Sequence, residues 1–201
     1  MRWFYPSVVW KIKTNEKTIF LTFDDGPIPI VTDFVLETLA NFNAKATFFC
    51  VGDNIVKFNE VFNEVINQGH SVANHTHNHL NGWKTNDEEY LQNIKICGQH
   101  FLDSKLGKMF RPPYGKITKK QIQLIDNQYV IIFWDVLVGD FDLNLSPQIM
   151  LEKAIKNTEN GSIVVFHDSQ KAFQNMKYVL PKYLKHFKNL GYKFELLEYY
   201  L

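Results

Sequence analysis

The chain has 201 residues, of which 45% are hydrophobic and 21% charged, and this length and composition suit one globular domain of ordinary size. Its 22 Lys and Arg residues against 21 Asp and Glu leave a formal net charge of +1, which gives no broad basic field of the kind that draws proteins to nucleic acid or anionic lipid. Two cysteines are too few for a disulfide framework, and no apolar run approaches the roughly 20 residues of a membrane-spanning helix.

Residues 1–17 do not resemble a secretory signal. They lack an uninterrupted apolar segment followed by a small-residue cleavage site, and Lys11 and Lys13 come early. A cytoplasmic location is therefore expected by default, with a cell-envelope or secreted location as the alternative if a leader has been removed.

The elements expected in chain order alternate between short strands and longer helices. Strands are expected at 18–23, 46–51, 71–73, 109–110, 129–134, 163–166 and 193–197. Helices are expected at 30–41, 55–68, 87–102, 118–127, from 146–147 onward, and at 176–190. Asn86 with Glu89 three residues later is typical of a helix start, as is Ser146 followed by Pro147.

This alternation predicts one domain over residues 1–201 with about seven parallel strands and helices outside them, either closed into a barrel or spread as a doubly wound sheet. Polar clusters follow five of the strands, at 24–25, 74–79, 111–115, 135–142 and 167–168. Both architectures place the active site at the carboxyl ends of the strands, so we expect one composite site there.

Two adjacent carboxylates, Asp24 and Asp25, end the first of these strands and run into a Gly-Pro pair. Successive strand residues point to opposite sides, so the two are expected to do different jobs: one can bind a cation while the other stays free as a base. On its own, the motif is also explained by an Asp-Gly turn with a spare carboxylate.

Four of the seven histidines fall within ten residues: His70, His75, His77 and His79. In an extended segment His75 and His79 lie ~13 Å apart, too far to share a metal, whereas a helical turn places them side by side with His77 facing away. His75 and His79 are therefore the ligand candidates, and His70 is interpreted as structural. Together with Asp25 they make a set that suits catalytic Zn²⁺, and also Fe²⁺, Co²⁺ or Mn²⁺.

Three stretches of the sequence resemble the first three motifs of the polysaccharide deacetylases, the NodB-like carbohydrate esterases of family 4. They are TFDDGP at 22–27, GHSVANHTHNH at 69–79 and RPPYG at 111–115. The resemblance extends from about residue 19 to residue 167. It implies an α/β fold, a distorted (β/α) barrel, and an enzyme that removes acetyl groups from N-acetylated sugars such as chitin and peptidoglycan.

The resemblance also implies roles for the matching residues. Asp24 would be the general base, Arg111 would orient it, and Tyr114 would offer its backbone N–H to the oxyanion. Arg111 is one of only two arginines in the chain, and its planar fork suits a carboxylate better than a lysine does. Pro112 would stiffen the substrate-binding loop. The single divalent metal, zinc first and cobalt, manganese, iron or nickel as alternatives, would be held by Asp25, His75 and His79.

GSIVVFHD at 161–168 matches the fifth motif of the family. The resemblance implies that His167 is the general acid. It also implies that Val165, or failing that Val164, lines the pocket for the acetyl methyl group.

The fourth motif departs from the pattern, because the family often has WxxDxxDW where this chain has WDVLVGDF at 134–141. Leu137 stands where an acid that tunes the histidine is usual, and Phe141 replaces a tryptophan that lines the substrate groove. We expect Asp140, or failing that Asp135, to contact Arg111 or His167 and to supply part of the missing support.

These observations predict a metal-dependent hydrolase that removes N-acetyl groups from a chitin-like or peptidoglycan-like polymer or oligomer by cleaving a linear amide C–N bond. The expected partner is that carbohydrate, with no nucleic acid and no membrane span, and the oligomeric state stays open. A serine hydrolase is disfavoured because no GxSxG motif occurs. Two alternatives stay open: a catalytically weakened carbohydrate-binding pseudoenzyme, and a hydrolase of a non-sugar amide bond on the same fold.

Overall fold

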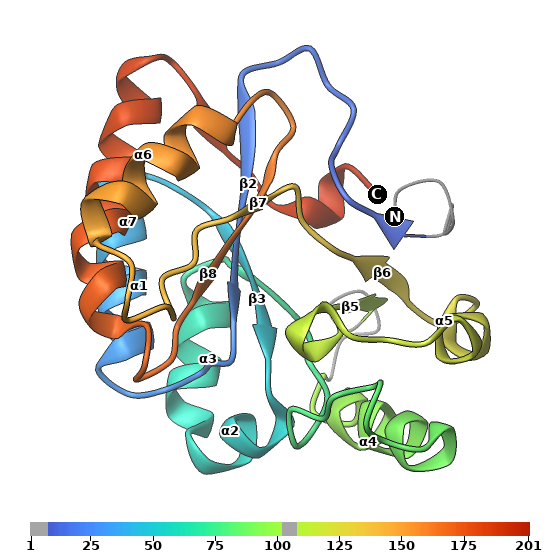
Figure 1. Cartoon of the computed structure of the whole chain (residues 1–201). Helices are drawn as coiled ribbons and strands as arrows, with labels where there is room; N and C mark the ends of the chain where they lie inside the picture. The colour runs from blue at the N-terminus through green and yellow to red at the C-terminus, as the bar shows by residue number, and fades with distance from the viewer. Residues whose placement is uncertain (1–7, 102–107) are drawn as a thin grey trace.

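The computed structural model describes residues 8–101 and 108–201, whose strands form one parallel sheet in the order β1-β6-β5-β4-β3-β2-β8-β7, with β9 pairing with β2 (Figure 1). The strands are β1 Val8–Val9, β2 Thr18–Asp24, β3 Ala46–Cys50, β4 Ser71–Asn74, β5 Met109–Phe110, β6 Val130–Ile132, β7 Val136–Leu137, β8 Ile163–His167 and β9 Lys193–Phe194. The sheet curls on itself, and this confirms the predicted distorted (β/α) barrel over the doubly wound alternative.

Helices cover the outside of the sheet. They are α1 Val31–Asn41, α2 Gly52–Lys57, α3 Asn59–Asn67, α4 Asp87–Gly98, α5 Lys119–Ile125, α6 Pro147–Asn157 and α7 Phe173–Asn189, with 3-10 turns η2 Pro113–Gly115 and η3 Leu197–Tyr199. In Figure 1, α1, α6 and α7 lie together on one side of the sheet, and α4 and α5 lie on the other. Among the described residues, no helix combines the length and the apolar character needed to cross a bilayer.

Several predicted boundaries are wrong. The two-residue strands β1 and β7 were too short to be recognised by periodicity. The helix expected at 55–68 is two helices, because Phe58 leaves helical geometry with φ −127° and ψ 46°. The helix expected to run to Leu102 ends at Gly98, and Leu102 itself lies outside the described residues. The final strand is confined to 193–194 and is followed by η3.

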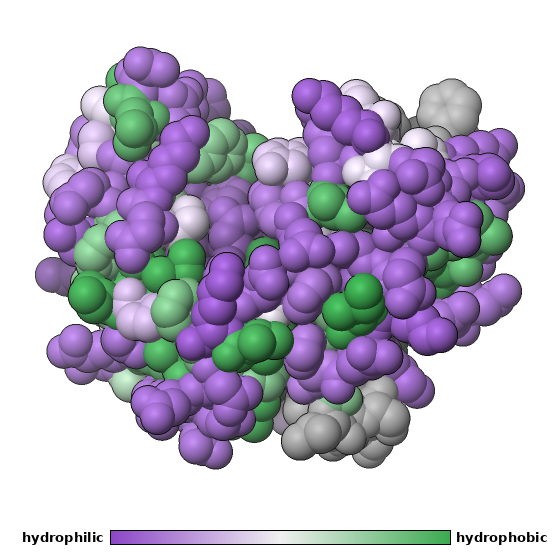
Figure 2. Space-filling view, turned by 90° about the horizontal axis from the view of Figure 1, so that it is seen from below, coloured by the Kyte–Doolittle hydropathy of each residue, from purple (hydrophilic) through white to green (hydrophobic). Residues whose placement is uncertain are grey.

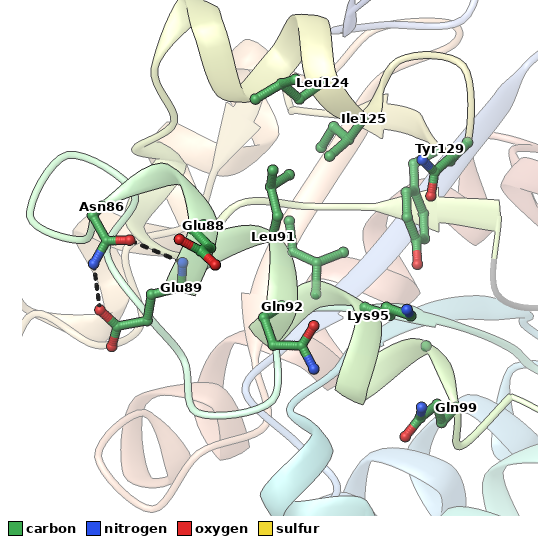
Figure 3. A pocket seen from close by; sticks show the side chains of 13 residues that line it. Asn86, Glu88, Glu89, Leu91, Gln92, Lys95, Gln99, Leu124, Ile125 and Tyr129 are labelled. Carbon is green, nitrogen blue, oxygen red and sulfur yellow. Dashed lines mark hydrogen bonds between the residues drawn. The ribbon is translucent and has the colours of Figure 1, made fainter.

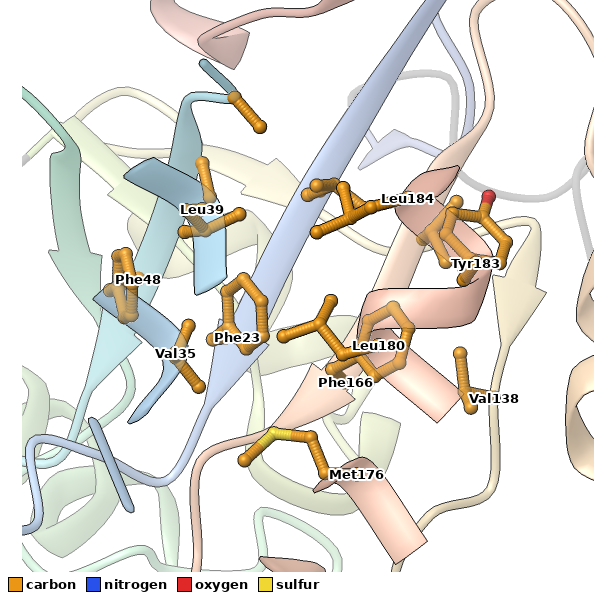
Figure 4. Close-up of a cluster of buried hydrophobic side chains, with 14 of the residues drawn as sticks. Phe23, Val35, Leu39, Phe48, Val138, Phe166, Met176, Leu180, Tyr183 and Leu184 are labelled. Carbon is orange, nitrogen blue, oxygen red and sulfur yellow. The ribbon is translucent and has the colours of Figure 1, made fainter. Parts of the chain in front are cut away.

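The outer face of the sheet packs against α1 and α7 through a row of aromatic rings. Phe48, Phe23 and Phe166 come from the neighbouring strands β3, β2 and β8, with ring centroids 5.0 and 5.7 Å apart along the row. Figure 4 shows these rings facing Val35 and Leu39 of α1, and Met176, Leu180 and Leu184 of α7. This buried layer fixes the strands against the helices that cover them.

The inner face of the curled sheet has its own apolar floor, to which six strands each contribute one buried residue: Phe20, Phe49, Ala73, Met109, Ile132 and Ile163. Along β2, side chains alternate between this interior and the outer core, so that Thr22 and Asp24 face inward while Leu21 and Phe23 face outward. Because β2 and β8 pair with Asp24 opposite His167, two polar side chains end neighbouring strands on the same inner face.

Candidate active site

A cavity of about 370 Å³ opens at the carboxyl ends of the strands, where the sequence predicts a composite site. Figure 2 views the molecule from this end, where hydrophilic residues predominate and hydrophobic ones form small separate patches. The cavity is lined by Asp24, Asp25, His75, His79, Tyr114, Trp134, Leu137, Phe141, His167, Ser169 and Lys171. Residues at or just after the ends of six strands, β2, β4, β5, β6, β7 and β8, thus meet in one place.

One carboxylate of the site, Asp24, is held by a buried guanidinium. Arg111 Nη1 donates to Asp24 Oδ1 at 2.7 Å and to the Thr22 hydroxyl at 2.7 Å. Nε and Nη2 of Arg111 donate to the carbonyl oxygens of Ile132 and Phe133, so backbone acceptors hold the rest of the fork. Burial lowers the pKa of Arg111, but the adjacent carboxylate favours its charged form. This contact agrees with the orienting role that the resemblance implies for Arg111.

A second set of groups has the composition of a metal site. Asp25 Oδ1 lies 3.8 Å from His75 Nε2 and 3.1 Å from His79 Nε2, and one donor atom from each of the three residues lies within 4.8 Å of the others. His75 Nδ1 donates to the Arg111 carbonyl oxygen at 2.8 Å, which leaves Nε2 with a free lone pair. The donors present, two imidazole nitrogens and one carboxylate oxygen, fit a divalent transition metal with open coordination positions.

The charge states of these residues also suit a metal. Burial lowers the pKa of His75 to about 4, so its imidazole is neutral at physiological pH, as metal binding requires. Burial alone raises the pKa of Asp25, but the hydrogen bond to His79 and the charges of nearby histidines hold it well below its usual range. The site therefore presents an ionised carboxylate beside a neutral imidazole.

The loop that carries the two histidines is not helical, so the predicted helical turn is wrong. Thr76 and His79 instead adopt left-handed conformations, with φ 63° and 54°. The Asn93 side chain accepts the backbone N–H groups of His77 and Asn78, and this bends the segment back on itself. The rings of His75 and His79 consequently lie 5.1 Å apart without a helix.

Two other histidines lie apart from the metal-type cluster, as predicted. His77 turns toward Asp53, with Nε2 3.5 Å from the carboxylate, and stacks on His100. His70 is buried, its Nδ1 accepts the Ala46 backbone N–H, and burial lowers the pKa of His70 to about 4. The structural interpretation of His70 is therefore confirmed.

Asp24 and Asp25 have different partners, as expected, because Asp24 contacts Arg111 and Asp25 contacts His75 and His79. Both nevertheless line the same cavity, so the expectation that they point to opposite sides is wrong. Strand β2 ends at Asp24, and Asp25 then takes a left-handed conformation with φ 84°. This turns the Asp25 carboxylate out of the strand alternation and toward His75 and His79.

His167 is supported by Asp140, as the sequence predicts. Nδ1 of His167 donates to Asp140 Oδ1 at 2.8 Å, and its backbone N–H donates to Oδ2 at 2.8 Å. Burial opposes the charged imidazole, but Asp140 and the carboxylates Asp25 and Asp24 raise the pKa of His167 to about 9. The fallback candidate, Asp135, accepts hydrogen bonds from Ser162 and Ile163 instead, away from His167.

The residues predicted to bind substrate are placed in different ways. Tyr114 is exposed at the rim of the cavity, with its hydroxyl 3.1 Å from His79 Nδ1, a contact that the sequence did not predict. Phe141 lines the cavity edge-on to the His167 ring at 4.9 Å. Pro112 and Val165 are buried and are not part of the lining; Val165 faces inward one layer below His167, paired with Thr22.

Sequence reasoning assigned no site role to several residues that lie here. Trp134, Ser169 and Lys171 line the cavity, and Lys171 Nζ lies 5.8 Å from the centroid of the Phe141 ring. Asp168 is fully buried directly after His167, and burial raises its pKa to about 8. In the sequence, Asp168 belongs to the polar cluster at 167–168 and ends the match to the fifth motif, but no role was assigned to it.

A larger hollow of about 850 Å³ lies between α4 and α5 (Figure 3). At its edge, Asn86 caps α4 by accepting the Glu89 N–H while its amide donates to the Glu89 carboxylate, as the sequence predicts. In the part of the chain that the structure describes, the metal-type cluster is at the smaller cavity and not here. The candidate site is therefore identified by the side chains that line the smaller cavity and not by cavity volume.

Known proteins resemble this chain in both sequence and structure. The model of the family described as polysaccharide deacetylase matches residues 11–129. A peptidoglycan-N-acetylglucosamine deacetylase of Bacillus cereus is 34% identical over 201 residues, covering 96% of this chain and 93% of the relative. A chitooligosaccharide deacetylase of Azorhizobium caulinodans is 29% identical over 164 residues, covering 79% of this chain and 77% of the relative.

A crystal structure of a peptidoglycan N-acetylglucosamine deacetylase, in complex with a naphthyl-substituted N-oxidanyl-benzamide, superposes on this chain with a TM-score of 0.90 at 30% identity. The superposition covers 97% of this chain and 92% of the crystallised chain. The resemblance in fold therefore extends over nearly the whole molecule.

Proposed function

The chain belongs to the polysaccharide deacetylase family, and from this membership we propose that it is a metal-dependent hydrolase that removes N-acetyl groups from a sugar polymer. We further propose that residues 1–201 form a single catalytic domain. The observation that carries the proposal is the meeting of three groups in one cavity: the Asp25, His75 and His79 cluster, the Asp24–Arg111 pair and the His167–Asp140 pair.

Asp25, His75 and His79 are proposed to hold the metal, and zinc suits their donor set best. A divalent cation held there would supply Lewis-acid chemistry, which lowers the pKa of water and polarises a carbonyl group. His75 is prepared for this role by its neutral ring and by its hydrogen bond to the Arg111 carbonyl, which aims Nε2 at the cluster.

Asp24 is proposed to act as the general base. Its carboxylate lines the cavity on the strand next to His167, and it accepts the proton of the attacking water as the new C–O bond forms. Arg111 holds Oδ1 of Asp24 through one hydrogen bond, so the carboxylate is fixed in direction while Oδ2 stays available. The base therefore has one oriented oxygen and one reactive oxygen.

His167 is proposed to act as the general acid. Asp140 holds Nδ1, so Nε2 carries the proton that passes to the amide nitrogen as the C–N bond breaks. The backbone N–H of Tyr114 donates to the oxygen on which negative charge develops. The products are acetate and a free sugar amine, and the proton taken by Asp24 balances the proton given by His167.

The proposed substrate is an N-acetylated polysaccharide, with peptidoglycan ahead of chitin-like oligomers because the relative from Bacillus cereus covers nearly the whole chain. Phe141 and Tyr114, whose rings border the cavity, are proposed to contact the sugar. Pro112 is proposed to shape that wall of the groove, and Val165 to lie beneath the acetyl methyl group.

The decisive experiment measures acetate release from peptidoglycan fragments, from chitooligosaccharides and from non-sugar acetamides, with and without a chelator. We expect release that stops on chelation and returns when zinc is restored, and none from Asp24→Asn. Binding of sugar without release supports the pseudoenzyme instead. Release only from non-sugar acetamides supports the second alternative, so each result selects one function.

A further inference from the structure

Asp168 is a buried carboxylate beside the site for which the proposed reaction has no use. Its side chain has no exposed surface. Oδ1 accepts the backbone N–H of Gly26 at 3.0 Å, and Oδ2 accepts the hydroxyl of Thr32 at 2.6 Å. A fully buried carboxylate costs free energy unless its contacts offset that cost, so the position calls for a role.

The contacts of Asp168 converge on the turn that carries Asp25. Gly26, whose N–H Asp168 accepts, directly follows Asp25, and the backbone N–H of Asp168 donates to the Asp24 carbonyl oxygen at 3.0 Å. The Asn54 side chain donates to the Asp25 carbonyl oxygen at 2.7 Å. The peptide group before the Asp25 α-carbon is therefore held by the backbone of Asp168, and the peptide group after it by the side chains of Asp168 and Asn54.

This support matters because Asp25 has a conformation that non-glycine residues seldom adopt, with φ 84°. A left-handed residue at a strand end persists only where the surroundings determine it. Releasing the Gly26 N–H would let Asp25 return to extended geometry, which would turn its carboxylate away from His75 and His79.

The fit between Asp168 and the turn is close. A Cβ atom built on Gly26 would lie 1.9 Å from Asp168 Oδ2, so only glycine leaves room for the carboxylate. Thr32, in the first turn of α1, donates to Asp168 and accepts the N–H of Ile28 at 2.8 Å. The carboxylate thus joins the end of β8, the 26–28 turn and the start of α1.

We propose that Asp168 is a positioning residue that holds the left-handed conformation of Asp25 and so directs the Asp25 carboxylate toward His75 and His79. The inference rests on the proposed function only in treating Asp25 as a metal ligand. It assigns Asp168 an effect on metal affinity and none on proton transfer.

The test measures zinc affinity by competition with a chromophoric chelator, using the metal-free 201-residue chain and its Asp168→Ala and Asp168→Asn variants. Asp168→Ala is expected to weaken zinc binding roughly 10–100-fold, the range for residues that orient metal ligands. Asp168→Asn keeps an oxygen that accepts the Gly26 N–H and is expected to recover most of the affinity. The visible absorption spectrum of the cobalt-loaded proteins reports any change in coordination.

Leu184→Ala is the matched control, because Leu184 lies in the outer core between the sheet and α7 and its loss destabilises the fold away from the turn. Its zinc affinity is expected to stay near that of the unmodified protein. Equal affinity losses in Leu184→Ala and Asp168→Ala, or an unchanged affinity in Asp168→Ala, would overturn the proposal.

Where Asp168→Ala does not fold, Thr32→Val is the deciding variant. It removes the hydroxyl that donates to Asp168 and accepts the Ile28 N–H, and it keeps the side-chain volume. We expect weaker zinc binding, and an unchanged affinity overturns the role. If the unmodified protein binds no zinc, the proposed metal site is wrong. If it binds zinc with an affinity that does not depend on Asp168, only the proposed role of Asp168 is wrong.

Discussion

The carboxylate of Asp140 holds His167 at two points, accepting both the ring Nδ1–H and the backbone N–H, each at 2.8 Å. Asp140 is itself fully buried, and Asn175 of α7 donates to its backbone carbonyl oxygen at 2.9 Å. The resemblance to the family implies an acid at position 137, where this chain has Leu137, and Asp140 makes the contact with His167. Asp140 therefore orients His167 and raises its pKa without a carboxylate at position 137.

This pair predicts how the rate depends on pH. A general acid must be protonated, so kcat/KM falls as pH rises through the pKa of His167, which Asp140 raises to about 9. Asp140→Asn removes the charge and is expected to move this alkaline limb down by roughly 1–3 pH units. A cation bound nearby lowers the pKa of His167 in the unmodified protein and in Asp140→Asn alike. The two proteins are therefore compared at equal metal occupancy. An alkaline limb that does not move would assign the proton donor elsewhere.

Leu137→Asp is expected to act in the opposite direction. Leu137 lines the cavity on β7, next to β8, and an added carboxylate there favours the protonated imidazole. The alkaline limb of kcat/KM should rise. No change would mean that the new carboxylate does not face His167, or that His167 does not titrate in this limb.

Asp24→Asn is expected to abolish turnover and retain the metal. The amide oxygen still accepts the Arg111 hydrogen bond, but the side chain takes no proton, and the ligand cluster is untouched. His75→Ala is the comparison, since it should lose both metal and activity. Metal content measured beside kinetics separates the two, and a near-normal rate in Asp24→Asn would show that the base lies elsewhere.

Arg111→Met is expected to destabilise the fold by about 3–5 kcal/mol, because it leaves the buried Asp24 carboxylate unpaired. Urea unfolding measures the loss. The double variant Asp24→Asn with Arg111→Met should lose less than the sum of the single losses, since it leaves no lone charge. Additive losses would indicate that the two side chains do not interact.

His79→Gln and His77→Gln form a pair that tests the ligand assignment. His79 Nε2 faces Asp25, whereas His77 faces Asp53 and stacks on His100. Zinc affinity measured by chelator competition is therefore expected to fall sharply for His79→Gln and to change little for His77→Gln. The reverse order would exchange the two histidines in the site.

Strand ends were predictable from the sequence because their chemistry is local. Buried runs such as 18–23 and 163–166 are apolar and end in polar residues, so Asp24 and His167 could be placed at one edge of a parallel sheet. The family expected from the motifs is confirmed over residues 11–129. The strand ends needed only periodicity, residue type and chain order, whereas the family was expected from the resemblance of the motifs.

Loop geometry was not predictable in the same way. His75 and His79 were identified as partners, but the helical turn expected to join them is replaced by left-handed residues and by hydrogen bonds to Asn93 on α4. Asp25 likewise depends on Asp168, far away in the sequence. Such conformations are set by tertiary contacts between distant segments, which sequence periodicity does not report.

Because β2 lies in the middle of the sheet, the part of the site on β2 is expected to be more stable against local unfolding than the part on the surface loops. β2 is hydrogen-bonded to β3 on one side and to β8 and β9 on the other, so the amide protons leading up to Asp24 should exchange with solvent only when the whole domain unfolds. The amides around His79 and Tyr114 belong to surface loops and should exchange through small local openings. Hydrogen exchange followed by mass spectrometry should therefore divide this one cavity into a slowly and a rapidly exchanging half.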